Sequence, residues 1–180
     1  MYKIAFEKAG IIKPNIPVVI GETHPETKPV FIEVAKKNSS DISFADQEVD
    51  KTFESDLKGN YQVHNIKTVL QALKKIPKGH FKISDEHIKS GLLNVVKNTG
   101  LHGRWEILQH HPKIICDTAH NREGLTYVME QLKDENYQNL HIVFGVVNDK
   151  DLNSILPLMP KHATYYFCKP NIERGLDAEI

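Results

Sequence analysis

The order of apolar segments after residue 103 constrains the fold of this chain more than any other feature. Two strand-like runs, 104–111 and 113–117, flank a His-Pro pair and are expected to form a hairpin. An amphipathic helix over 122–134 follows, and then the continuous apolar run "LHIVFGVV" at 140–147, which is typical of a strand buried on both faces. A short helix in "DLNSILPLMP" and a strand in "ATYYFCK" come next. This alternation predicts an α/β sheet with parallel strands, in which ligands bind beyond the carboxyl ends of the strands.

The earlier part of the chain is predicted to contain short strands within 16–22 and 41–46 and helices within 26–40, 61–76 and 84–97. The longest of these helices is expected to bury one apolar face, made of Val63, Ile66, Leu70 and Leu73. The last helix is expected to begin at the cap Ser84 and to bury Ile88, Leu92 and Val95.

Two glycines in "KNTGLHG" interrupt the pattern at residues 97–103. We therefore predict one domain at 1–102 and a second at 103–180. The final "RGLDAEI" is expected to begin another helix, and the opening residues to lie in a helix without a cap. Both features suggest that the sequence is a fragment.

Composition excludes several classes of function. The 180 residues contain 23 basic and 23 acidic side chains, so there is no excess of positive charge of the kind that binds nucleic acid or an anionic membrane. No apolar run approaches the roughly 18 residues of a membrane span, and the start does not resemble a signal peptide. Cys116 and Cys168 lie in apolar runs, which predicts buried, reduced thiols in a cytoplasmic protein. The ten histidines are scattered and lack the spacing of a zinc site.

The stretch "KIICDTAHN" places Asp117 and His120 where a predicted strand ends and a helix begins. The carboxylate there can accept hydrogen bonds from ribose hydroxyls, and the imidazole can bond a phosphate or a carboxylate. The N-terminus of the helix adds backbone donors and the positive end of its dipole. A second interpretation is that Asp117 or Asn121 simply caps the helix, and a third, weaker one is a metal pair.

Other candidates carry similar ambiguity. In "EKAGIIK", small residues follow Lys8 and permit a close approach of phosphate or metal, but the residues alone favour a solvated helix end with a glycine cap. Asn65 can hydrogen-bond a purine edge or belong to a polar helix surface. Arg104 suits a phosphate or an interdomain ion pair. The segment 148–151, "NDKD", is a helix entry that can border a ligand crevice.

These motifs together resemble one family. The stretches "IAFEKAGIIKPNIPVVIGE", "SDLKGNYQVHN", "GRWEIL", "IICDTAHN", "GVVNDKD" and "ERGLDAE" occur in the order found in bacterial folylpolyglutamate synthase / dihydrofolate synthase, a branch of the Mur ligase superfamily. The resemblance implies the end of a P-loop-type ATPase domain followed by an incomplete Rossmann-like C-terminal domain. It implies a ligase of folate biosynthesis and one-carbon metabolism that uses ATP and Mg²⁺ to add L-glutamate to a folate or to dihydropteroate through an acyl phosphate.

The resemblance also implies roles for five residues. Lys8 matches a lysine that becomes a carbamate and helps hold magnesium in the full-length enzyme. Asn65 matches a residue that contacts adenine, and Arg104 and Asp117 match residues that reach the nucleotide phosphates and ribose. His120 matches a histidine near the phosphates and the incoming glutamate.

The sequence departs from the family in two ways. The family usually has D-G-A-H-N-P, whereas Thr118 and Arg122 stand here for the glycine and the proline. No G-x-x-x-x-G-K-[ST] occurs in the 180 residues, so we expect them to be inactive alone and Lys8 to be unmodified. Alternative functions are another Mur-type amino-acid ligase or a non-catalytic nucleotide-binding module. The oligomeric state and the preference between folate and dihydropteroate stay open.

Overall fold

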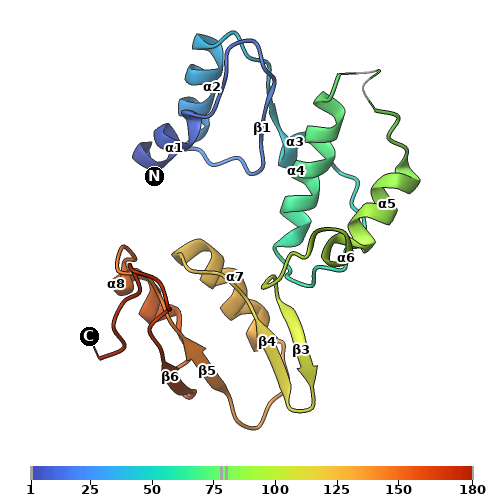
Figure 1. Ribbon diagram of the computed structural model, residues 1–180. Helices are drawn as coiled ribbons and strands as arrows, with labels where there is room; N and C mark the ends of the chain where they lie inside the picture. The colour runs from blue at the N-terminus through green and yellow to red at the C-terminus, as the bar shows by residue number, and fades with distance from the viewer. Residues whose placement is uncertain (1, 78, 80, 180) are drawn as a thin grey trace. The chain divides into compact units, whose positions relative to one another are not determined.

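The computed structural model describes residues 2–77, 79 and 81–179, and it divides the chain into two compact units. The first unit holds the residues up to Leu57 together with Tyr61–Gly100, and the second holds Lys58–Asn60 and the residues from Leu101 onward (Figure 1). The predicted outer bounds, Met1 and Ile180, lie outside the described residues. The assignment of 1–102 and 103–180 to two particular domains stays a prediction.

The first unit begins with a small parallel sheet between helices. Its elements are α1 (Tyr2–Ala9), β1 (Val18–Ile20), α2 (Lys28–Lys37), β2 (Ile42–Phe44) and α3 (Ala45–Glu48). The two strands pair in parallel, with Val18 opposite Ile42, as the apolar runs at 16–22 and 41–46 predicted. A core cluster of Ala5, Ala9, Ile12 and Val30 joins α1 to α2. Small residues on α1 allow this close packing.

Three further helices complete the first unit: α4 (Gln62–Lys75), α5 (Asp85–Leu93) and α6 (Val95–Thr99). Ile66 and Leu70 of α4 are buried as predicted, but Val63 is exposed, so the predicted buried face was wrong there. Gln71 is buried instead, and its Nε2 donates to Glu48 Oε2 at 2.6 Å, so the NH₂ group of the buried amide has an acceptor.

The helix predicted over 84–97 is interrupted at Asn94, whose backbone φ of −132° is not helical. The Asn94 side chain donates instead to Ser90 O at 2.8 Å, a bond that competes with helix continuation. Ile88 and Leu92 lie half-buried against the cluster that contains Ile66 and Leu70.

The start of α5 confirms the predicted cap at Ser84. Its Oγ accepts from His87 N at 3.3 Å, and His87 Nδ1 accepts from Ser84 N at 3.2 Å. Ser84→Ala removes one acceptor and should weaken the helix by about 1 kcal/mol, so α5 amides should exchange about fivefold faster with solvent. Ser90→Ala, on the exposed surface of the same helix, is the control and should not accelerate exchange. Equal rates in Ser84→Ala and the parent chain would contradict the cap.

The second unit consists of two strand pairs and a central helix. Its elements are β3 (Glu106–His110), β4 (Lys113–Cys116), α7 (Arg122–Lys133), β5 (His141–Phe144), α8 (Leu152–Ile155), a 3₁₀ turn (Leu156–Leu158) and β6 (Thr164–Phe167). β3 and β4 form the predicted antiparallel hairpin, and β5 pairs with β6 in parallel. Leu125 and Val128 of α7 are buried, and α7 contacts α8 and the 3₁₀ turn.

The α/β class is confirmed, but three details of the prediction were wrong. Val143 of β5 is 73% exposed, because alternate residues of this strand pack against the protein and only one face is covered. Within the described part of the chain β4 and β5 are not paired, so the strands form separate two-stranded sheets. The segment 174–179 is not a helix; there Gly175 forms an isolated bridge with Val147.

The two cysteines differ from the prediction in burial. Both are free thiols, but Cys116 is only partly buried and Cys168 is exposed. Cys168 follows the last residue of β6, beyond the covered part of that strand. None of the described helices is long and apolar enough to cross a membrane.

Candidate functional site

The loop between β4 and α7 lies at the carboxyl end of a strand and at the start of a twelve-residue helix. Asn121 caps α7, because its Oδ1 accepts from Gly124 N at 2.8 Å. The sequence left Asp117 and Asn121 as alternative caps, and the structure assigns the role to Asn121. Asp117 therefore has a different function in the fold.

Asp117 joins this loop to the turn before β3. Its Oδ2 accepts from Trp105 N at 2.7 Å, and its Oδ1 accepts from Ala119 N at 2.8 Å. Trp105 has a φ of 51°, a left-handed conformation that is uncommon for residues other than glycine. The carboxylate thus stabilises an unfavourable backbone conformation while holding the two loops together.

Gly103 and Thr118 form the second connection between the loops. Thr118 N donates to Gly103 O at 3.0 Å, and Gly103 has a φ of 70°. A Cβ at Gly103 would lie 2.5 Å from Thr118 Cγ2, so the position requires glycine for both conformation and space. Residues 103–105 and 117–121 are therefore one structure, which we call the paired loops.

Arg104 and His120 are the two cationic candidates on the paired loops. Arg104 Nη1 donates to Gly103 O at 3.1 Å and to Thr118 Oγ1. His120 is exposed, and its Nδ1 lies 2.9 Å from Thr118 O. Because a carbonyl can only accept, Nδ1 carries the proton in this contact, and Nε2 is the ring nitrogen that can face a ligand. Arg104, Asp117 and His120 are thus brought together around Thr118.

Glu106 supports the paired loops from β3 and provides a pH-dependent test. The pKa of its carboxyl is lowered from the ordinary value of 4.5, first because Gly103 N donates to Oε2 at 2.8 Å and second because His102 Nδ1 lies 2.7 Å from Oε1. A folded-state pKa below the unfolded one means that this stabilisation is present above pH 4.5 and is lost as the pH falls through the lowered value. The unfolding midpoint in urea, followed by fluorescence of the single and buried Trp105, should therefore fall on acidification.

Glu106→Gln removes the titration, so its midpoint should depend less on pH between about pH 5 and about pH 3 than that of the parent chain. Glu130→Gln, at an exposed position of α7, is the matched control and should keep the parent's dependence. An identical pH dependence in Glu106→Gln and the parent would refute the role of this carboxylate.

Lys8 and Asn65 belong to the first unit. Lys8 is exposed in the last turn of α1, and Asn65 is exposed on α4, where its Nδ2 donates to Gln62 Oε1 at 2.9 Å. This bond orients the amide and leaves its carbonyl oxygen as an acceptor for another group. The roles of Lys8 and Asn65 stay predictions.

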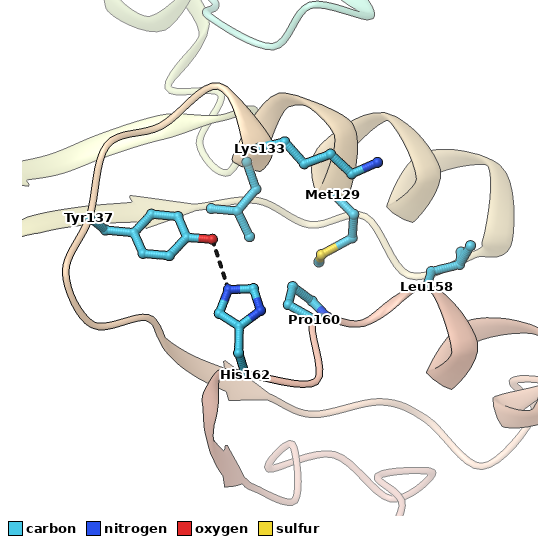
Figure 2. A pocket seen from close by; sticks show the side chains of 7 residues that line it. Met129, Lys133, Tyr137, Leu158, Pro160 and His162 are labelled. Carbon is cyan, nitrogen blue, oxygen red and sulfur yellow. Dashed lines mark hydrogen bonds between the residues drawn. The ribbon is translucent and has the colours of Figure 1, made fainter.

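The described residues of the second unit line the two hollows that follow. An open depression of about 640 Å³ is lined by Asn148, Ile172, Glu173 and Arg174. A smaller pocket of about 180 Å³ lies near the C-terminal end of α7, where Tyr137 Oη and His162 Nε2 are 3.1 Å apart (Figure 2). Ligand sites are usually about 300–1,000 Å³, so the smaller pocket is below the common size.

The described residues do not form a metal centre by themselves. Among them no group of three or more histidine, cysteine, aspartate or glutamate side chains is placed to hold an ion. Both Asp117 oxygens accept backbone N–H groups. The metal-pair interpretation of Asp117 and His120 stays a hypothesis.

The comparisons with known proteins agree on one relationship. The family model for the glutamate ligase domain of Mur ligases matches residues 103–180. The dihydrofolate synthase/folylpolyglutamate synthase of Bacillus subtilis is 29% identical over 86% of this chain, and the folylpolyglutamate synthase of Lacticaseibacillus casei is 31% identical over 82%. The chain spans 40% and 39% of these two relatives.

Solved structures give the same result. The folylpolyglutamate synthase of Thermotoga maritima is 28% identical with a TM-score of 0.69, over 98% of this chain and 46% of that one. The Mycobacterium tuberculosis enzyme complexed with ADP has a TM-score of 0.83 at 23% identity, over 99% of this chain and 45% of that one. A bifunctional synthase with Mn, AMPPNP and L-glutamate bound has a TM-score of 0.78 at 24% identity, with the same coverage.

Residues 103–180 therefore match the glutamate ligase domain of the Mur ligases. The resemblance of the chain to the folylpolyglutamate synthase / dihydrofolate synthase branch is confirmed.

Sequence reasoning found Arg104, Asp117 and His120 but missed the residues that hold them. Thr118 was noted only as a departure from the family pattern, and Glu106 was not singled out. The available signal for Glu106 was its spacing of three residues from Gly103, which suits a carboxylate that closes a turn onto a backbone N–H.

Proposed function

We propose that the 180 residues are part of a cytoplasmic ATP-dependent ligase that adds L-glutamate to a folate or to dihydropteroate through an acyl phosphate. The paired loops carry this proposal, because they combine a guanidinium, an imidazole and a helix N-terminus at the end of a strand. Such a group of donors suits the negative charge of nucleotide phosphates and of a phosphorylated carboxylate.

The residues have distinct roles in this proposal. Arg104 donates to phosphate oxygens, and His120 lies where the phosphate and the incoming glutamate meet. Asp117 orients the backbone of both loops and is the residue proposed to accept from a ribose hydroxyl. Asn65 contacts adenine. The relatives solved with ADP or with AMPPNP and L-glutamate support these ligand classes.

Magnesium is included because phosphoryl transfer needs a cation to offset charge. A solved relative contains Mn, which supports a divalent ion in the family. Lys8, as a carbamate, is the residue proposed to contribute to that site, together with groups outside the described residues. In the 180-residue protein we expect Lys8 to be unmodified, and an intact mass that includes a carbamate would contradict this.

A chimera tests the proposed activity. The 180 residues replace the matching segment of the Bacillus subtilis enzyme, and ADP release is measured with ATP, Mg²⁺, glutamate and either tetrahydrofolate or dihydropteroate. We expect release that depends on glutamate and on one of these acceptors, reduced about 100-fold by His120→Ala. Glu130→Gln, at an exposed position of α7, is the control. A chimera active only with UDP-muramyl precursors would replace the folate assignment by another Mur-type ligase.

A further inference from the structure

Thr118 is a departure from the family pattern that lies at the centre of the paired loops. Its backbone N donates to Gly103 O at 3.0 Å, and its Oγ1 donates to the same oxygen at 3.1 Å. The same Oγ1 accepts from Arg104 Nη1. A hydroxyl has one proton and two lone pairs, so it can make both of its bonds at once.

Arg104 is therefore held at two points. Nη1 donates to Gly103 O at 3.1 Å as well as to Thr118 Oγ1, and Gly103 O in turn accepts from Thr118. Both bonds of the guanidinium use Nη1, so the Nε and Nη2 donors are not needed for them. A glycine at position 118 would supply neither the hydroxyl nor the methyl group that lies beside Gly103.

We propose that Thr118 is a positioning residue that fixes the guanidinium of Arg104 in the orientation in which it binds nucleotide phosphate. This inference rests on the proposed function, because it concerns the same site. A long arginine side chain loses conformational freedom when it binds an anion, and a hydrogen bond that already restricts it lowers that cost. The threonine side chain thus restricts the Arg104 side chain before the anion binds, which a glycine at position 118 cannot do.

Gly103 complements Thr118 in this arrangement. Its left-handed φ directs its carbonyl to Thr118 and Arg104, and its missing side chain leaves room for Thr118 Cγ2. The hydroxyl and the methyl group of Thr118 therefore act on different partners. They can be removed separately: Thr118→Ser keeps the hydroxyl, and Thr118→Val keeps a methyl group but loses the acceptor.

The test combines guanidinium NMR signals with ADP affinity, using the 180-residue protein. Wild type and Thr118→Ser should show Arg104 guanidinium signals of a restricted side chain, assigned by their loss in Arg104→Ala, and Thr118→Val and Thr118→Gly should show averaged ones. ADP affinity should fall about fivefold to tenfold in Thr118→Val and Thr118→Gly, the cost of ordering one such side chain, but not in Thr118→Ser. In an Arg104→Ala background, Thr118→Val should have no further effect on ADP affinity.

Two results would overturn the inference: Arg104 signals that are equally averaged in wild type and Thr118→Val, or a loss in Thr118→Val that persists in the Arg104→Ala background. The failure of the proposed function is distinguishable from both. If Arg104→Ala alone leaves ADP affinity unchanged, the nucleotide role of Arg104 fails. The guanidinium signals then decide by themselves whether Thr118 holds the side chain.

Discussion

Replacing Asp117 by alanine is expected to destabilise the second unit by about 2 to 4 kcal/mol, because two backbone N–H groups lose a charged acceptor at once. The bonds concerned are those from Trp105 N at 2.7 Å and Ala119 N at 2.8 Å. Loss of the first also removes the contact that stabilises the left-handed backbone of Trp105. Urea unfolding followed by Trp105 fluorescence measures this effect in the unit where it occurs.

Asp117→Asn refines the test. An amide keeps one acceptor oxygen but presents an NH₂ group to the other N–H, so the expected loss is smaller, about 1 to 2 kcal/mol. Asp149→Asn is the matched control, since Asp149 is exposed and its contact with Arg174 Nη1 is 3.5 Å long; such surface pairs contribute about 0 to 1 kcal/mol. If Asp117→Ala and Asp149→Asn have equal stability, Asp117 does not hold the paired loops.

Gly103→Ala should destabilise the second unit at least as much as Asp117→Ala does. We expect its free energy of unfolding to fall by about 2 to 5 kcal/mol, because the variant combines an unfavourable φ with a steric overlap. The φ is 70°, and the added Cβ would lie 2.5 Å from Thr118 Cγ2. The unfolding free energy is again measured in urea through Trp105 fluorescence.

Two further variants separate the causes. In Gly103→Ala/Thr118→Ser the methyl group that overlaps is gone, so the steric part of the loss should be recovered and the conformational part should remain. Gly100→Ala tests the conformational part in the first unit, because Gly100 has a φ of 67° and nothing lies within 4 Å of its Cβ position. There the loss, followed by circular dichroism, should be about 1 to 2 kcal/mol. If the double variant is no more stable than Gly103→Ala, the overlap with Thr118 Cγ2 is not the reason that position 103 requires glycine.

Much of the fold follows from local patterns. The helix over 122–134, the hairpin around the His-Pro pair and the cap at Ser84 depend on periodicity and on side chains near in sequence, and the structure confirms them. The exposure of Val143 does not follow from its neighbours, because it depends on which faces of β5 other segments cover. The break at Asn94 is a competition between a side-chain bond and helix continuation, which apolar spacing does not register.

The sequence allowed a prediction of which residues belong to the candidate site. It did not allow a prediction of the hydrogen bonds that join them. Strand-end position and residue type indicated Asp117 and His120. The bonds from Trp105 N to Asp117 and from Arg104 to Thr118 join residues 12 and 14 positions apart, across a hairpin. Sequence spacing carries no information about such contacts until the register of β3 and β4 is known. For this reason the hydrogen bonds by which Asp117 joins the paired loops are seen only in the three-dimensional structure.

We propose above all that the paired loops of this chain bind the nucleotide phosphates. The most direct measurement is an NMR titration of the ¹⁵N-labelled chain with ADP. We predict saturable shifts of the amides in 103–105 and 117–121, which are abolished in Arg104→Ala. Shifts confined to the residues that line the pocket of Figure 2, or no shifts at all, would contradict the claim.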